Sequence, residues 1–194
     1  MVDVHRSLRY LSLYSFTYPF MPGISVFETD RLALKKFNIT DAQGFYELNL
    51  DPEVIRYTGD VPFATVSEAK SFIRSYDHYE RYGFGRWSVF TKDTDDYIGF
   101  CGLNYRPALD EVDVGFRFLR IYWGKGYATE AARGSLLYGF TEYALNKIVA
   151  RAMQGNLASH RVLHKLGMRL EKTFEAEGAV WYQYACMPAD LNLV

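Results

Sequence analysis

Cysteine, net charge and long apolar segments are all scarce in this sequence of 194 residues. Only two cysteines occur, Cys101 and Cys186, and they form neither a CxxC pair nor the framework of a secreted disulfide protein. Each lies in an apolar, strand-like run, so we expect two buried, reduced thiols in a cytoplasmic protein. The formal net charge of -1 provides no overall basic field, so we expect neither nucleic acid nor a membrane surface as a partner.

An export signal is also missing from the N-terminal stretch. Residues 1–20 have a basic start followed by leucine, tyrosine and phenylalanine, but polar side chains interrupt the run. No small-residue cleavage pattern follows it. We therefore do not expect export, and the length of the chain suits one compact domain with a sizeable core.

What the sequence does contain is an ordinary globular composition, with 49% hydrophobic and 17% aromatic residues. Alternating apolar residues predict strands, and helical spacing between capping signals predicts helices. The predicted strands span residues 29–37, 86–91, 97–105, 112–118, 148–153, 168–174 and 181–187, and the predicted helices span residues 40–50, 65–83, 127–146 and 156–167. A helix between the strands at 112–118 and 148–153 implies a parallel crossover. The expected fold class is α+β, with one mixed, mostly antiparallel sheet of about seven strands flanked by about four helices.

The most informative stretch is residues 113–130, where a strand runs into a tight glycine turn and then into a helix that starts near Tyr127. Gly124 and Gly126 flank Lys125, so the backbone has access to dihedral angles closed to other residues and can approach a ligand closely. The free N–H groups and the dipole of a helix N-terminus favour an anion, and a pyrophosphate suits both. The stretch therefore predicts a site for a phosphate-bearing cofactor.

Two familiar nucleotide motifs do not fit this turn. The Walker A pattern has four residues between its first glycine and Gly-Lys-Ser/Thr, whereas here the two glycines are one residue apart. The dinucleotide pattern needs Gly or Ala three residues after its second glycine, where this chain has Thr129. A plain glycine turn before a core helix is the alternative to a cofactor site.

Residues 123–128, Trp-Gly-Lys-Gly-Tyr-Ala, closely resemble the acetyl-CoA loop of the GNAT superfamily of N-acetyltransferases. Trp123 stands at the Gln/Arg position of the family loop, as is usual in the branch of ribosomal-protein alanine N-terminal acetyltransferases. Residues 156–168 resemble a second family motif, which begins Asn-x-x-Ser and ends Lys-x-Gly-Phe/Met. The resemblance covers residues 27–187. It implies a single acetyltransferase domain at residues 27–194 and an N-terminal extension at residues 1–26, in which Met21 is a possible start.

This resemblance implies a particular cofactor site. The CoA pyrophosphate is expected on the loop and the first helical turn, with Asn156 also near the cofactor; the loop residues are Trp123, Gly124, Lys125, Gly126, Tyr127, Ala128 and Thr129. The family sheet is splayed between its fourth and fifth strands, and we expect a bulge at Gly115 to open it. The backbone groups of Phe116 and Phe118 are then expected to pair with the pantetheine amides. Arg120, where family members commonly have proline, is expected to add positive charge together with Lys125.

Direct attack of an amine on a thioester requires the amine to lose a proton and the thiolate to gain one. For the base, Asp113 falls where the branch carries Glu, and Glu111 shares its strand face; a water relay and a plain solvated strand edge are the alternatives. For the acid, Ser159 is the best remaining hydroxyl, with helix capping as its alternative role. Neither cysteine has an activating motif, so we expect no acyl-enzyme. His160 and His164 lack the Glu of a zinc-binding HExxH helix, so we expect surface residues and no metal.

The sequence thus predicts an acetyl-CoA-dependent N-acetyltransferase that transfers acetyl directly to a primary amine in a ternary complex. We expect the acceptor to be a protein N-terminus or a small-molecule amine, and the protein to be a monomer or homodimer. By the resemblance, residues 51–63, Tyr105 and the last hairpin should form the acceptor pocket. The alternative is a non-catalytic acyl-CoA-binding or interaction module of the same fold. Both bind CoA, but only an enzyme releases free CoA in proportion to the acceptor.

Overall fold

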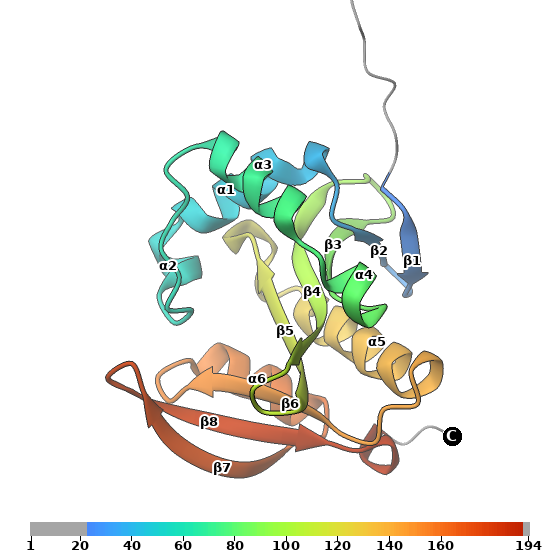
Figure 1. Cartoon of the computed structure of the whole chain (residues 1–194), viewed down its shortest axis with the longest axis vertical. Coiled ribbons are helices and arrows are strands. Elements are labelled where there is room, and N and C mark those ends of the chain that lie inside the picture. The colour runs from blue at the N-terminus through green and yellow to red at the C-terminus, as the bar shows by residue number, and fades with distance from the viewer. Residues whose placement is uncertain (1–22, 192–194) are drawn as a thin grey trace, which may run out of the picture.

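The structure is a computed structural model that describes residues 23–191, and its strands form one eight-stranded sheet in the order β1-β2-β3-β4-β5-β6-β8-β7. Neighbouring strands are antiparallel except β5 and β6, which are parallel, as the sequence predicted (Figure 1). The strands are β1 (Ser25–Glu28), β2 (Leu32–Lys36), β3 (Arg86–Thr91), β4 (Tyr97–Arg106), β5 (Glu111–Phe118), β6 (Ile148–Met153), β7 (Arg169–Ala176) and β8 (Ala179–Cys186). The expected α+β, mostly antiparallel fold is confirmed, with one strand more than expected.

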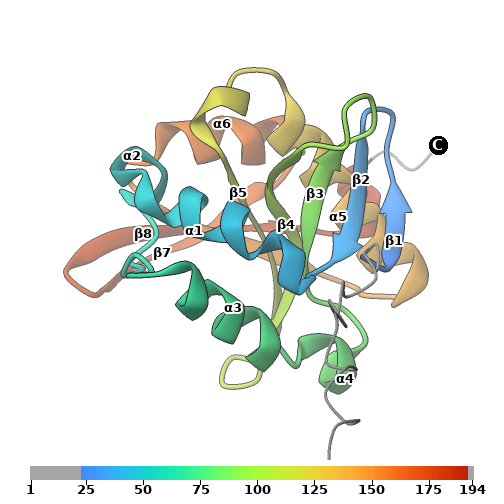
Figure 2. The ribbon, with the colours of Figure 1, turned by 90° about the horizontal axis from the view of Figure 1, so that it is seen from above.

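Helices cover both faces of this sheet. They are α1 (Ala42–Leu50), α2 (Pro52–Ile55), α3 (Val66–Ser75), α4 (His78–Tyr82), α5 (Tyr127–Glu142) and α6 (Leu157–Lys165). Figure 2 shows α1 and α3 on one side of the strands and α6 on the other, and α5 packs into the larger core beside the strands.

Strand β1 is the element that the sequence pattern did not predict. Phe27 pairs with Leu34 of β2, and Ser25 pairs with Lys35. The sheet therefore begins inside the stretch predicted to be an extension, residues 1–26. Residues 1–22, which include the possible start at Met21, lie outside the described part of the chain.

The predicted helix at residues 65–83 is wrong in its continuity, because it divides into α3 and α4. Thr65 caps α3 as expected, its side chain accepting a hydrogen bond from the backbone N–H of Glu68. Tyr76 then adopts an extended conformation, with φ -76° and ψ 100°, and ends the helix. The Tyr76 hydroxyl accepts a hydrogen bond of 2.6 Å from the backbone N–H of Arg86, so the interruption turns this ring toward the sheet.

The expected splay is present between β5 and β6. These strands share a single register pair, Asp113 with Val149, whereas β4 and β5 pair continuously from Gly99↔Phe118 to Arg106↔Glu111. Because that register never shifts, the bulge predicted at Gly115 is wrong. Gly115 instead makes room for Arg86, since an added Cβ would lie 2.5 Å from the Arg86 Nη2 atom. The sheet opens because the backbone pairing between β5 and β6 is limited to this one register pair.

The two cysteines are buried and free, as predicted. Burial raises the pKa of the Cys101 thiol to about 11, and burial likewise raises that of Cys186 to about 11. No helix formed by residues 23–191 combines the length and the apolar character needed to cross a membrane.

Candidate active site

The glycine turn leads from β5 into the N-terminus of α5. Gly124 and Gly126 have φ angles of 76° and 85°, which glycine adopts at little cost. An atom added at the Cβ position of Gly124 would meet nothing within 4 Å, so this side of the loop is open. Gly126 is the N-cap of α5, and no side chain caps the first turn of this 16-residue helix. Its first backbone N–H groups and its dipole therefore remain available to an anion.

The larger side chains around the loop have contacts of their own. The Trp123 indole N–H donates to the Phe118 carbonyl at 2.7 Å, and the Lys125 ammonium lies 5.0 Å from the centroid of the Tyr122 ring. Arg120 is ion-paired with Asp51, with 2.9 Å between Nε and Oδ2. Arg120 thus has a carboxylate partner outside the loop.

A cleft of about 750 Å³ passes through the opening between β5 and β6. Two of the segments expected at the acceptor pocket, residues 51–63 and the β7–β8 hairpin, line this cleft through Tyr57, Thr58, Asp60, Phe174, Ala176, Glu177 and Trp181. Tyr105 does not line it; that ring packs against Tyr82, and its hydroxyl donates to Asp110. Phe116, on the open edge of β5, lines the cleft together with Ser159 on the α6 side.

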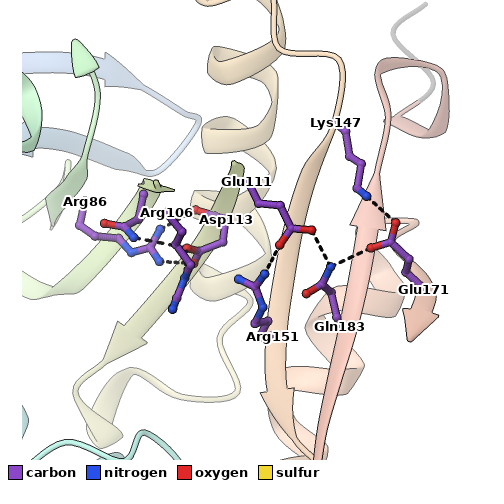
Figure 3. A network of polar contacts seen from close by, with 9 residues as sticks. Arg86, Arg106, Glu111, Asp113, Lys147, Arg151, Glu171 and Gln183 are labelled. Atoms are coloured by element: carbon purple, nitrogen blue, oxygen red, sulfur yellow. Dashed lines mark hydrogen bonds and ion pairs between the residues drawn. The ribbon is translucent and has the colours of Figure 1, made fainter. Parts of the chain in front are cut away.

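Asp113 lies on the wall of this cleft between two arginines (Figure 3). Its Oδ2 is 2.6 Å from Arg86 Nη2, its Oδ1 is 2.9 Å from Arg106 Nε, and only 5% of the residue is exposed. Burial raises the pKa of the Asp113 carboxyl, but the two guanidinium groups outweigh it and hold the pKa below its ordinary value. Asp113 is therefore an ionised partner of two cations and not a solvated strand edge.

Glu111 belongs to a second ionic group, which continues across β6, β8 and β7 (Figure 3). Its carboxylate pairs with Arg151 and accepts a hydrogen bond of 3.0 Å from the Gln183 amide. The same amide donates to Glu171 at 2.8 Å, and Glu171 pairs with Lys147. Both carboxylates proposed as bases are thus already bound to cations.

Asn156 and Ser159 lie together at the start of α6. The Asn156 side chain caps this helix by accepting a hydrogen bond of 3.1 Å from the backbone N–H of Ser159. The Ser159 hydroxyl has no hydrogen-bond partner among the residues that the structure describes, and it borders the cleft. The capping role considered for Ser159 is consequently performed by Asn156.

His160 is not the surface residue that the sequence predicted, although His164 is exposed. His160 is 9% exposed, and its Nε2 lies 3.1 Å from the Met153 carbonyl and 3.2 Å from the Gln154 carbonyl. Nε2 therefore carries a proton, and Nδ1 is hydrogen-bonded to the Tyr184 hydroxyl at 2.9 Å. Burial follows because α6 packs this face onto β8. No group of three or more His, Cys, Asp or Glu side chains within residues 23–191 is arranged to hold a metal ion.

Sequence reasoning missed the arginines of the cleft. Arg86 reaches from β3 across β4 to Asp113, and Arg117 pairs with Asp60. Gly115 was the one available sign, because a glycine inside a strand pattern often marks the close approach of another group. Nothing local identifies Arg86 as that group.

Comparison with known proteins gives the family of this fold and loop. The model of the acetyltransferase (GNAT) domain family matches residues 31–169. The chain belongs to this family. It is also 35% identical over 145 residues to p20 of Bacillus licheniformis, described as an uncharacterized N-acetyltransferase, with coverage of 74% of this chain and 82% of the relative. The protein is therefore an N-acetyltransferase.

Solved structures agree with this family fold. A GNAT-family acetyltransferase from Bacillus anthracis superposes with a TM-score of 0.72 at 28% identity, covering 82% of this chain and 96% of its own. The ribosomal-protein-S5-alanine acetyltransferase of Vibrio fischeri gives 0.72 at 18% identity, with coverage of 87% and 99%. Spermidine N-acetyltransferase of Vibrio cholerae, in complex with CoA and spermine, gives 0.69 at 18%, with coverage of 82% and 97%. Of these three structures, the Vibrio cholerae enzyme is the one described with CoA bound.

Proposed function

We propose that this GNAT protein transfers acetyl from acetyl-CoA directly to a primary amine in a ternary complex. The observation that carries the proposal is the open edge of β5, which borders the cleft at Phe116 and leads along the chain to the glycine loop. Bound acetyl-CoA supplies the thioester that the amine attacks. The loop and the first turn of α5, residues 123–129, would hold its pyrophosphate through backbone N–H groups.

The open edge of β5 offers backbone groups at a defined spacing. The Leu119 N–H donates to the Ile98 carbonyl at 2.9 Å, so Gly99 and Phe118 form a non-hydrogen-bonded pair. In such a pair, the backbone N–H and C=O groups of each residue point away from the partner strand. Phe116 and Phe118 therefore turn their backbone groups toward the β6 side. The Trp123 indole already occupies the Phe118 carbonyl. Phe116 is thus the principal residue proposed to pair with the pantetheine amides.

The free energy needed to deprotonate the amine acceptor depends on the pKa of that amine. For a lysine-like amine, deprotonation near neutral pH costs about 4–5 kcal/mol, and for an α-amino group only about 1 kcal/mol. The two guanidinium groups beside Asp113 lower its pKa and so weaken it as a proton acceptor, and Glu111 is ion-paired with Arg151. We therefore favour a water relay along these carboxylates, and an acceptor of low pKa such as the α-amino group of a protein N-terminus. A small-molecule amine of low pKa fits the same condition.

The departing thiolate needs a proton donor, and we assign this role to Ser159. Its hydroxyl borders the cleft and is not used in capping α6. Cys101 and Cys186 are buried with raised pKa values, which supports direct transfer without an acyl-enzyme. We further propose that the protein acts in the cytoplasm as a monomer or homodimer.

The decisive experiment measures free thiol released from acetyl-CoA with a panel of peptides, amino acids and polyamines. The panel is needed because neighbours at 18% identity show the fold alone, and their acceptors differ: one is a ribosomal-protein-S5-alanine acetyltransferase and the other a spermidine N-acetyltransferase. Thiol release in proportion to one acceptor, with intersecting initial-rate lines, is the expected result. Parallel lines would refute the ternary complex. CoA binding without release for any amine would favour the non-catalytic module.

A further inference from the structure

Glu130 presents an electrostatic problem for the proposed cofactor site. It lies in the first turn of α5, immediately after the residues whose N–H groups would receive the pyrophosphate. A carboxylate there would repel a bound anion if its charge were exposed. Its side chain is only 17% exposed, and its ion-pair partner comes from the N-terminal part of the chain, between β1 and β2.

Arg31 neutralises that carboxylate from the turn between β1 and β2. Its Nε and Nη2 lie 2.7 Å and 2.6 Å from Glu130 Oε2. The Arg31 backbone N–H and the Thr29 hydroxyl donate to Oε1 at 2.8 Å and 2.6 Å. Burial raises the pKa of Glu130, but these hydrogen bonds and the Arg31 charge prevail and lower it. Both carboxylate oxygens are thus turned toward Arg31 and Thr29.

The same arginine also holds the glycine loop itself. Its remaining nitrogen, Nη1, donates to the Lys125 carbonyl at 3.0 Å, and its Cζ lies 4.6 Å from the centroid of the Tyr127 ring. Lys125 sits between the two positive-φ glycines, so this bond fixes the peptide in the middle of the turn. One guanidinium therefore contacts both the loop and the acid beside it.

We propose that Arg31 is a positioning residue of the cofactor site, which holds the glycine loop open and masks the charge of Glu130 so that the pyrophosphate of CoA can bind. This inference rests on the proposed function, since it requires CoA at the loop. The guanidinium of Arg31 is already bonded to Glu130 and to the Lys125 carbonyl. Its effect is consequently exerted through those two groups.

The test is a double-mutant cycle on CoA affinity, measured by calorimetry. Arg31→Gln should weaken CoA binding by about 10-fold, because it releases the loop and exposes Glu130. Glu130→Gln alone should change affinity by less than about threefold, and added to Arg31→Gln it should recover part of the loss. The loss in Arg31→Gln should also shrink at high salt, where the repulsion by Glu130 is screened.

Lys35→Gln is the matched control. Lys35 lies on β2, pairs with Asp95 at 2.9 Å and covers the Phe90 ring at 4.4 Å, yet contacts no part of the loop. The Lys35→Gln variant should bind CoA as the wild type does. If Arg31→Gln does not fold, as judged by urea unfolding, Arg31→Lys replaces it; this variant keeps the charge and should show a smaller loss.

The outcomes separate the two proposals. Wild-type protein that fails to bind CoA would refute the proposed function and this inference together. Wild-type protein that binds CoA while Arg31→Gln binds equally well would overturn only the role of Arg31. A loss in Arg31→Gln that Glu130→Gln does not relieve, with unchanged salt dependence, would reduce Arg31 to a structural residue.

Discussion

Replacing Asp113 with asparagine distinguishes an ion-pair role from a catalytic base. The change removes a negative charge that two guanidinium groups share, while almost preserving shape. Removing one partner of a buried ion pair typically costs about 3–5 kcal/mol, because the other charge is left uncompensated. Arg106 is half-exposed and can turn to water, whereas the Arg86 side chain is 16% exposed and keeps the carbonyls of Gly102 and Asp113 as acceptors. We therefore expect the lower end of this range, about 3 kcal/mol of unfolding free energy.

The pH dependence of this loss has a definite sign. Because the folded-state pKa of Asp113 lies below the ordinary value of 3.8, its charged form stabilises the fold at pH values above that range. The contribution disappears as pH falls through the lowered pKa. The difference in unfolding free energy between wild type and Asp113→Asn should be full near neutral pH and should narrow below about pH 4.

The assay is urea unfolding across pH, combined with a pH–rate profile on the same preparations. Asp95→Asn, at the exposed pair with Lys35, is the control and should cost less than about 1 kcal/mol. The reasoning fails if Asp113→Asn unfolds at the wild-type urea midpoint but loses activity near neutral pH and regains it at alkaline pH. That pattern would identify Asp113 as the base.

Three further predictions concern the loop, the proton donor and the thiols. Gly126→Val places a β-branched residue at a φ of 85°, which should cost about 1–2 kcal/mol and weaken CoA binding strongly; wild-type affinity by calorimetry would show that the loop is misassigned. Ser159→Ala should lower kcat by about 10–100-fold with little change in stability, whereas Asn156→Ala should cost about 1 kcal/mol through the lost cap. A less stable but fully active Ser159→Ala variant would exclude the proton-donor role. Cys101 and Cys186 should resist alkylation in the native state and react in urea, and rapid native labelling together with inactivation would contradict direct transfer.

Much of the fold was predictable because its signals are local. Strand bounds at residues 86–91 and 148–153 agree with β3 and β6, and Gly167, with φ 75°, follows α6 as its stop signal predicted. The division of the helix at residues 65–83 was not predictable, because Tyr76 is drawn out of helical geometry by its hydrogen bond to Arg86. A tertiary contact there overrides a continuous helical pattern.

By itself, the sequence determined the conformation of the glycine loop that we propose as the cofactor site. Gly124 and Gly126 specify a turn of positive φ, and the helix that follows presents unpaired N–H groups; both properties depend on residues within one turn of the site. Only the tertiary structure decided the electrostatics of the site. Asp113 meets Arg86 because β3, β4 and β5 lie side by side in the sheet, and Glu130 meets Arg31 from 99 positions away. Ion-pair partners depend on which strand face and which register bring charges together, and no short stretch of sequence contains that information.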